Sequence, residues 1–308
     1  ALSVGGNEWR RLQFQPLLLD VGRISPCYAY RYRKVGESDE AYGLRTANEL
    51  EAKIIEMGPE TVAAFVAETV VGATAGAVPP VPGYFKRIRE ICNRYGVLLI
   101  LDEIMCGVGR TGNWFACEQD GVAPDMITIA KGLAAGYQPI GALLVTEGIY
   151  DQIQKTSGFF QHSFTFMGHP VACAAGVATL NVIEETGLLS SVQIRGKELM
   201  EKLTTRFEGH PNVGDIRGRG LFQAIEFVED RVTKQPINAK LQFASQLKKA
   251  AFDRGLICYP MGGTIDGQQG DHVLLAPPFI VNSDDLVKIV TILGDAVDDV
   301  VKNLDFAN

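Results

Sequence analysis

Two oppositely charged side chains each follow a short apolar run, and their placement indicates a catalytic pair. Residues 98–101 precede Asp102, and residues 126–130 precede Lys131. Short apolar runs with helical segments between them are typical of buried parallel strands. The parallel strands of an open sheet end at one edge, where ligands bind. We therefore expect Asp102 and Lys131 to face one crevice.

A lysine and an aspartate in one crevice are the two groups that pyridoxal phosphate requires. The lysine forms a Schiff base with the aldehyde and then moves protons. The aspartate keeps the ring nitrogen protonated, so that the ring can accept electrons from the substrate carbanion. Glu103 is a rival for the aspartate role. Because neighbouring side chains on a strand point to opposite faces, only one of Asp102 and Glu103 can face the cofactor.

The segments around this pair predict the elements that position it. Helical spacing of apolar residues predicts helices, and short apolar runs predict strands. The predicted helices cover 38–57, 85–95, 170–185 and 188–207, and the predicted strands cover 62–67, 98–102, 126–130 and 141–146. Strands that alternate with helices favour an α/β fold with a mostly parallel sheet.

We place a domain boundary near residue 190. Residues 1–190 would form a large domain, and residues 191–308 a smaller C-terminal α/β domain. The smaller domain is predicted to contain strands over 220–228 and 273–275, a helix over 239–254, and a last helix capped by Ser283-Asp284-Asp285.

Composition narrows the class of protein. The chain has 308 residues, 46% of them hydrophobic and 21% charged, which is typical of a globular enzyme. A net charge of −7 disfavours nucleic acid as a partner, and no apolar stretch is long enough to span a bilayer. The six cysteines form no C-x-x-C pair and do not cluster with the histidines. We therefore expect no metal site and a reducing, cytoplasmic setting.

The loop after Asp102 contains two features that alone are weak signals. Gly107, Gly109 and Gly112 spell G-x-G-x-x-G, but four residues separate Asp102 from the first glycine, and a turn follows the last. A dinucleotide site needs a strand before and a helix after this motif, so we do not expect one. Cys106 suggests a nucleophile, although a buried spacer thiol is the favoured interpretation.

Longer motifs resemble a known family. Asp102-Glu103-Ile104, the glycine loop 107–112, Pro124-Asp125 and Ala130-Lys131-Gly132 are similar to the class III (omega) aminotransferases of pyridoxal-phosphate fold type I. The segments 164–170, 217–221 and 276–278 fit the same family. The resemblance runs from about Ala1 to the C-terminal helix.

The resemblance implies roles for individual residues. Lys131 would carry the cofactor, Asp102 would pair with the ring nitrogen, and Ile104 would pack on one face of the ring. Thr165 would bind the phosphate across the interface of a homodimer, with Phe164 helping through its main chain. The reaction implied is amino-group transfer between an amine or amino acid and a keto acid such as pyruvate.

The chain departs from the family pattern at several positions. Glu68 is expected near the active site, but Thr69 replaces the proline that usually follows it. Some relatives pair this acid with an arginine just before Ala-Pro-Pro, where this chain has Leu274 or a neighbour. The preceding loop, 262–271, has no arginine either. We expect weak binding of the keto-acid carboxylate unless another segment or another arginine, such as Arg110, Arg217 or Arg219, supplies the charge.

Relatives also carry a long segment before the equivalent of Ala1, with a phosphate loop and an aromatic residue that stacks on the ring. Either the chain is truncated or upstream residues are left out of the sequence. Two alternative functions stay open. One is another pyridoxal-phosphate reaction on the same scaffold, such as that of an aminomutase or decarboxylase, which would not require a keto acid. The other is a truncated, non-catalytic remnant that only dimerises.

Overall fold

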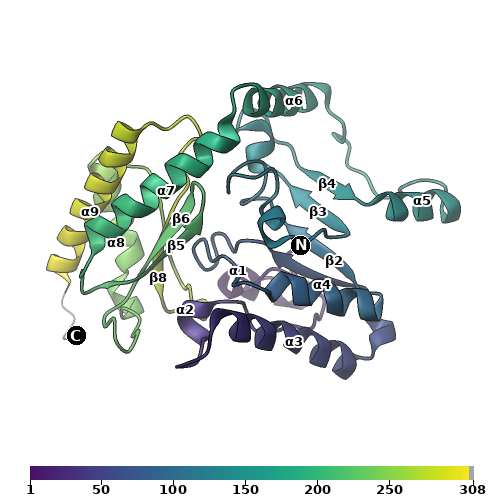
Figure 1. Cartoon of the computed structure of the whole chain (residues 1–308), viewed down its shortest axis with the longest axis horizontal. Coiled ribbons are helices and arrows are strands. Elements are labelled where there is room, and N and C mark those ends of the chain that lie inside the picture. The colour runs from purple at the N-terminus through teal and green to yellow at the C-terminus, as the bar shows by residue number, and fades with distance from the viewer. Residues whose placement is uncertain (305–308) are drawn as a thin grey trace.

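The computed structural model describes residues 1–304 and contains two four-stranded sheets. Figure 1 shows two parts side by side, the first coloured purple to teal and the second green to yellow. Each part has its own buried hydrophobic cluster. The chain passes from the first part to the second at the start of a long helix.

The first sheet contains the strands that end at the candidate catalytic residues. Its strands are β1 (Ala64–Glu68), β2 (Leu98–Asp102), β3 (Met126–Ile129) and β4 (Ala142–Val145), in that order. The first three strands are parallel, and β4 runs antiparallel to β3. The expectation of a mostly parallel sheet is therefore confirmed. The register places Glu68 and Thr128 on either side of Asp102.

One face of this sheet is covered by α3 (Asp39–Met57) and α4 (Tyr84–Tyr95). Ser38 caps α3 by accepting a hydrogen bond from the Ala41 amide at 3.2 Å. Leu99 and Leu101 of β2 are fully buried in the cluster that these helices form with the sheet. Since side chains alternate along a strand, Asp102 points to the opposite face.

Further elements precede the second sheet in the chain. They are α1 (Glu8–Leu12), η1 (Gln15–Leu17), α2 (Ala29–Tyr32), η2 (Pro59–Thr61), η3 (Ala116–Asp120), η4 (Lys131–Ala134), α5 (Glu147–Thr156) and α6 (Pro170–Glu185). The helix α6 packs against η4, where a Cβ on Gly176 would lie 3.6 Å from the Leu133 carbonyl oxygen. The small residues of α6 thus bring it close to the segment that begins with Lys131.

The second sheet has the order β5 (Val213–Arg219), β6 (Phe222–Phe227), β8 (Asp271–Leu275) and β7 (Tyr259–Gly262), with all neighbours antiparallel. Three helices pack with it, α7 (Leu188–Phe207), α8 (Phe243–Asp253) and α9 (Ser283–Asn303). A short η5 (Ala239–Leu241) precedes α8. Sequence analysis found β6, β8 and the helices but missed β5 and β7.

The cap of α9 differs from the predicted one. Ser283 is the first helical residue, and Asn282 is the N-cap. The Asn282 side chain accepts from the Asp285 amide at 2.9 Å, and the Asp285 carboxylate accepts from the Asn282 amide at 3.5 Å. An amide side chain followed three residues later by an acid forms this reciprocal pair, as in a capping box.

Helix α7 contributes Val192, Leu199 and Leu203 to the core of the second sheet. This assignment agrees with a boundary near residue 190, which stays a prediction. No helix in the described part of the chain is by itself long and apolar enough to cross a membrane. The pair α6 and α7, bent by 70° at their junction, passes that test only when the two are counted together.

Backbone segments from both parts meet with no room for side chains. A Cβ on Gly196 of α7 would lie 2.5 Å from the backbone of Gly220, and a Cβ on Gly220 would lie 2.7 Å from the backbone of Thr111. Gly220 lies in the turn between β5 and β6, and Thr111 in the glycine loop after β2. The loop beside Asp102 is therefore seated directly on the second part.

We predict that Gly196→Ala lowers the free energy of unfolding by about 1–3 kcal/mol, because overfilling a packed contact forces the backbones apart. Gly148→Ala is the matched control, since no atom lies within 4 Å of a Cβ built there. The control should be unchanged or more stable by up to about 1 kcal/mol. Urea unfolding monitored by circular dichroism measures both. Equal stability of the two variants would contradict this account of the contact.

Candidate active site

Asp102 ends β2 with one carboxylate oxygen free to bind a ligand. Its Oδ1 accepts a hydrogen bond from the Ile104 amide at 2.9 Å, which fixes the side chain against its own backbone. Its Oδ2 has no hydrogen-bond partner within residues 1–304. The aspartate thus presents an open acceptor on the face of the sheet away from α3 and α4.

Glu103 lies on the opposite face and is fully engaged. It is completely buried and accepts hydrogen bonds from the Thr69 hydroxyl at 2.8 Å, the Ala116 amide at 2.6 Å and the Cys117 amide at 2.8 Å. These contacts hold η3 against the ends of β1 and β2. Glu103 is therefore a structural acid, and its oxygens are not free for a ligand.

Thr69 is the residue that sequence analysis recorded only as a departure from the family pattern. Its hydroxyl satisfies the buried Glu103 carboxylate, and its own side chain is 1% exposed. Proline at this position has no hydroxyl to donate. The sequence contained the signal, an unexpected threonine beside a strand end, but not the partner, because the pairing depends on the register of β1 with β2.

Lys131 follows β3 in a rare backbone conformation. Its φ is +44°, in the left-handed region that residues other than glycine seldom occupy. Such strain persists only where the surroundings impose it, and it concentrates at functional sites. The side chain is exposed and forms no ion pair in the described part of the chain. The amine is therefore available for chemistry.

Glu68 joins these two residues into one electrostatic cluster. Burial raises the pKa of its carboxyl to about 7, the Gly72 amide bonded to it at 2.6 Å lowers that pKa, Asp102 raises it, and Lys131 lowers it. Glu68 pairs with Asp102 in the register of β1 with β2, and Lys131 follows the neighbouring strand β3 at the same sheet edge.

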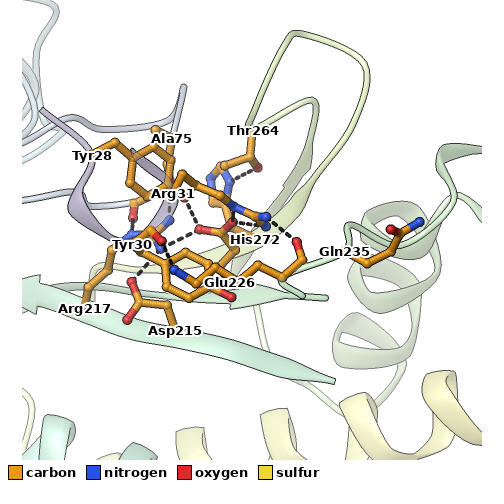
Figure 2. A network of polar contacts seen from close by, with 12 residues as sticks. Tyr28, Tyr30, Arg31, Ala75, Asp215, Arg217, Glu226, Gln235, Thr264 and His272 are labelled. Atoms are coloured by element: carbon orange, nitrogen blue, oxygen red, sulfur yellow. Dashed lines mark hydrogen bonds and ion pairs between the residues drawn. The ribbon is translucent and has the colours of Figure 1, made fainter. Parts of the chain in front are cut away.

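A buried polar network supports the loop that follows Glu68 (Figure 2). Arg217 donates to the carbonyls of Ala75 and Gly76 in that loop and pairs with Glu226 at 2.6 Å. Arg31 also donates to Glu226, at 2.6 Å, and the Tyr28 hydroxyl contacts the same carboxylate. A buried carboxylate needs such partners, because an unpaired charge is strongly destabilising. Sequence analysis missed this network entirely.

The arginines considered for substrate binding are occupied elsewhere. Arg110 donates to the carbonyls of Leu221 at 3.2 Å and Pro277 at 2.6 Å. Its guanidinium also lies 4.5 Å from the centre of the Phe279 ring. Arg219 pairs with Asp120 at 2.7 Å. Together with Arg217 in the Glu226 network, these residues hold the two parts of the fold together.

Thr165 and Phe164 lie apart from this cluster. They belong to the exposed segment between α5 and α6, and Phe164 is 73% exposed. No hydrogen bond in the described part of the chain joins Thr165 to Asp102 or Lys131. A role for Thr165 in phosphate binding stays a prediction, and it requires a second subunit.

The glycine loop and Cys106 have structural roles. Gly109 and Gly112 have positive φ and approach Phe279 and Gln193, and no helix begins at Gly112. The loop therefore lacks the helix that a dinucleotide site needs. Cys106 is 1% exposed, and burial raises the pKa of its thiol well above the usual range. This environment agrees with a spacer and not with a nucleophile.

Comparisons with known proteins identify the family of the chain. A model of the class-III aminotransferase family matches residues 1–297. An uncharacterized aminotransferase of Schizosaccharomyces pombe is 44% identical over 99% of this chain and 66% of its own length. Gamma aminobutyrate transaminase 2 of Solanum lycopersicum is 38% identical over 90% of this chain and 59% of its own length.

Solved structures are similar to the chain over nearly its whole length. An omega transaminase of Pseudomonas jessenii in complex with PMP has a TM-score of 0.87 and 37% identity, with 98% of this chain and 65% of that chain covered. A transaminase obtained by ancestral reconstruction has a TM-score of 0.89 and 34% identity, with coverages of 99% and 65%.

An α/β fold with a largely parallel sheet is the fold of the fold type I transaminases, to which these structural neighbours belong. The chain belongs to the class-III aminotransferase family. It spans roughly half to two thirds of the length of most curated relatives that it matches.

We predict that Thr69→Val lowers the free energy of unfolding by about 1.5–3 kcal/mol, because it removes one hydrogen bond to a buried charged group. Thr204→Val, on the exposed surface of α7, is the matched control and should change stability by less than about 0.5 kcal/mol. Guanidinium unfolding measures both. If the Thr69 variant is as stable as the control, the hydrogen bond from the Thr69 hydroxyl to Glu103 does not stabilise the fold.

Proposed function

We propose that this chain is the catalytic part of a pyridoxal-phosphate-dependent aminotransferase. The reaction moves an amino group between an amine or amino acid and a keto acid such as pyruvate. The single observation that carries the proposal is that Asp102, with one free carboxylate oxygen, and Lys131, with no ion-pair partner within residues 1–304, lie at the ends of neighbouring parallel strands. Membership of the class-III family supports it.

The residues present fit this cofactor. When bound, pyridoxal phosphate supplies an aldehyde that takes up the amino group and a ring that accepts an electron pair. The Lys131 amine would hold the aldehyde when no substrate is present. Once released, Lys131 Nζ would take the proton from the amine-bearing carbon of the donor. It would then return this proton at the cofactor carbon.

Asp102 would hold a proton on the ring nitrogen through its free Oδ2. A carboxylate beside a protonated ring nitrogen keeps that nitrogen positively charged, because opposite charges in a crevice stabilise each other. Glu103 cannot do this, since three donors already occupy it. Ile104, Glu68, Phe164 and Thr165 would complete the cofactor pocket, with Ile104 against one face of the ring.

We also propose a homodimer in which Thr165 of each subunit contributes to the phosphate site of the other. The segment around Thr165 exposes large apolar side chains, which favours an interface. They are Phe159, Phe160, Phe164, Phe166 and Met167, each more than half exposed. The cysteines are all free thiols, which supports a reducing, cytoplasmic location.

Lys131 is expected to be the lysine that binds the cofactor covalently. Borohydride reduction of the loaded protein, followed by peptide mapping, should place the label on the Lys131 peptide. Lys131→Ala should reduce the transamination rate by about 10²- to 10⁴-fold, as for loss of a general base. Lys86→Ala, an exposed lysine on α4, is the control and should keep normal rates. A label on another lysine would end this assignment.

Asp102→Asn should retain much of the cofactor affinity but lose transamination by about 10²-fold, as when one preorganised electrostatic partner is removed. Asparagine still forms a hydrogen bond but cannot keep the ring nitrogen protonated. Cofactor titration by absorbance and single-turnover kinetics separate the two effects. Near-normal turnover would show that another group holds the ring nitrogen.

A further inference from the structure

Glu68 is a half-buried acid at the candidate active site, and no step of the proposed transamination uses it. The register of β1 with β2 puts it beside Asp102 and on the same face of the sheet. Neighbouring strands lie about 4.8 Å apart, so the two carboxylates are close neighbours. One of them would be occupied by the cofactor, whereas the other would face whatever enters the crevice.

The Glu68 carboxylate is held in one orientation with one oxygen left over. Its Oε2 accepts the Gly72 amide hydrogen bond at 2.6 Å, and its Oε1 has no hydrogen-bond partner in the described part of the chain. A Cβ on Gly72 would lie 2.5 Å from Met105 Sδ and 3.0 Å from Glu68 Oε2, so a larger residue there would displace the ends of these two side chains. Arg217 anchors the same loop through Ala75 and Gly76.

No cation forms an ion pair with Glu68 within residues 1–304. Leu274 is instead buried in an apolar cluster with Val70 and Cys106, with Met105 packed against it. The guanidinium groups of Arg110, Arg217 and Arg219 are bound elsewhere, as described above. Arg10 of α1 acts on Glu68 only at long range, as the smallest of the influences on its pKa.

We propose that Glu68 is a specificity-determining residue that binds the distal ammonium group of a diamine donor and disfavours substrates with a second carboxylate. This inference rests on the proposed function. An ammonium group at Oε1 would form a charge-assisted hydrogen bond in a partly dry site, where such bonds are strong. A second carboxylate at this position would instead meet the negative charge of Glu68.

Binding of a diamine at Glu68 is predicted to depend on pH. The pKa of Glu68 is about 7, so the carboxylate is charged above neutral pH and loses its charge as the pH falls to 6. The charged groups that shift the pKa of Glu68 are Asp102, Lys131 and Arg10. The nearby Cys106 thiol stays protonated, because its own pKa is raised well above the usual range. Diamine affinity should therefore fall as the pH is lowered through 7.

Calorimetric titration tests the proposal without turnover. The full chain is saturated with pyridoxamine phosphate, which has no aldehyde to react with an amine, and is titrated with 1,4-diaminobutane or butylamine at pH 8. In Glu68→Gln the dissociation constant of the diamine should rise about tenfold more than that of the monoamine. Glu60→Gln, an exposed acid before β1, is the matched control and should change neither.

Two further readouts complete the test. Between pH 8 and pH 6 the wild type should lose diamine affinity relative to butylamine, whereas Glu68→Gln should not. Equal effects of Glu68→Gln on both amines, or no effect on either, would overturn the proposal. Conversion of the pyridoxal-phosphate form by butylamine is followed separately by absorbance. Failure of that conversion would contradict the proposed transamination, while the calorimetric comparison would still decide the role of Glu68.

Discussion

The active-site arrangement depends on the register of β1 with β2. In this register the pleat sorts four polar side chains into two pairs on opposite faces of the sheet. Glu68 and Asp102 lie on the face away from the covering helices. Thr69 and Glu103 lie on the other, where the threonine hydroxyl satisfies the acid at 2.8 Å. A shift of β1 by one residue would move Glu68 to the face covered by the helices and place Thr69 beside Asp102.

The second part of the fold positions the loops that follow β1 and β2 at this sheet edge. Arg217 on β5 reaches the loop after β1, and the glycine contact between α7 and the β5–β6 turn seats the loop after β2. These loops follow the strands that end in Glu68 and Asp102. A buried arginine bonded to backbone carbonyls fixes position more than it adds stability, since its desolvation offsets much of the attraction. The C-terminal sheet therefore acts as a support for the site.

Much of the site was predictable from local patterns. The apolar runs before Asp102 and Lys131 indicated strand ends, and the alternation of side chains showed that Asp102 and Glu103 cannot share a role. The Glu226 network was not predictable, because Arg31 and Glu226 are 195 residues apart in sequence. Strand β5 was missed because charged residues, among them Arg217 and Arg219, obscure its apolar pattern. The cap at Asn282 differed from the prediction by one position, which is the usual uncertainty of helix ends.

The central claim is that Asp102 and Lys131 hold one cofactor while Glu103 serves only the fold. A crystal structure of the protein grown with pyridoxal phosphate tests it most directly. The account predicts electron density continuous from Lys131 Nζ, a ring nitrogen within hydrogen-bond distance of Asp102 Oδ2, and Glu103 still bonded to Thr69. Density attached to another lysine, or a ring nitrogen bonded to Glu103, would contradict it.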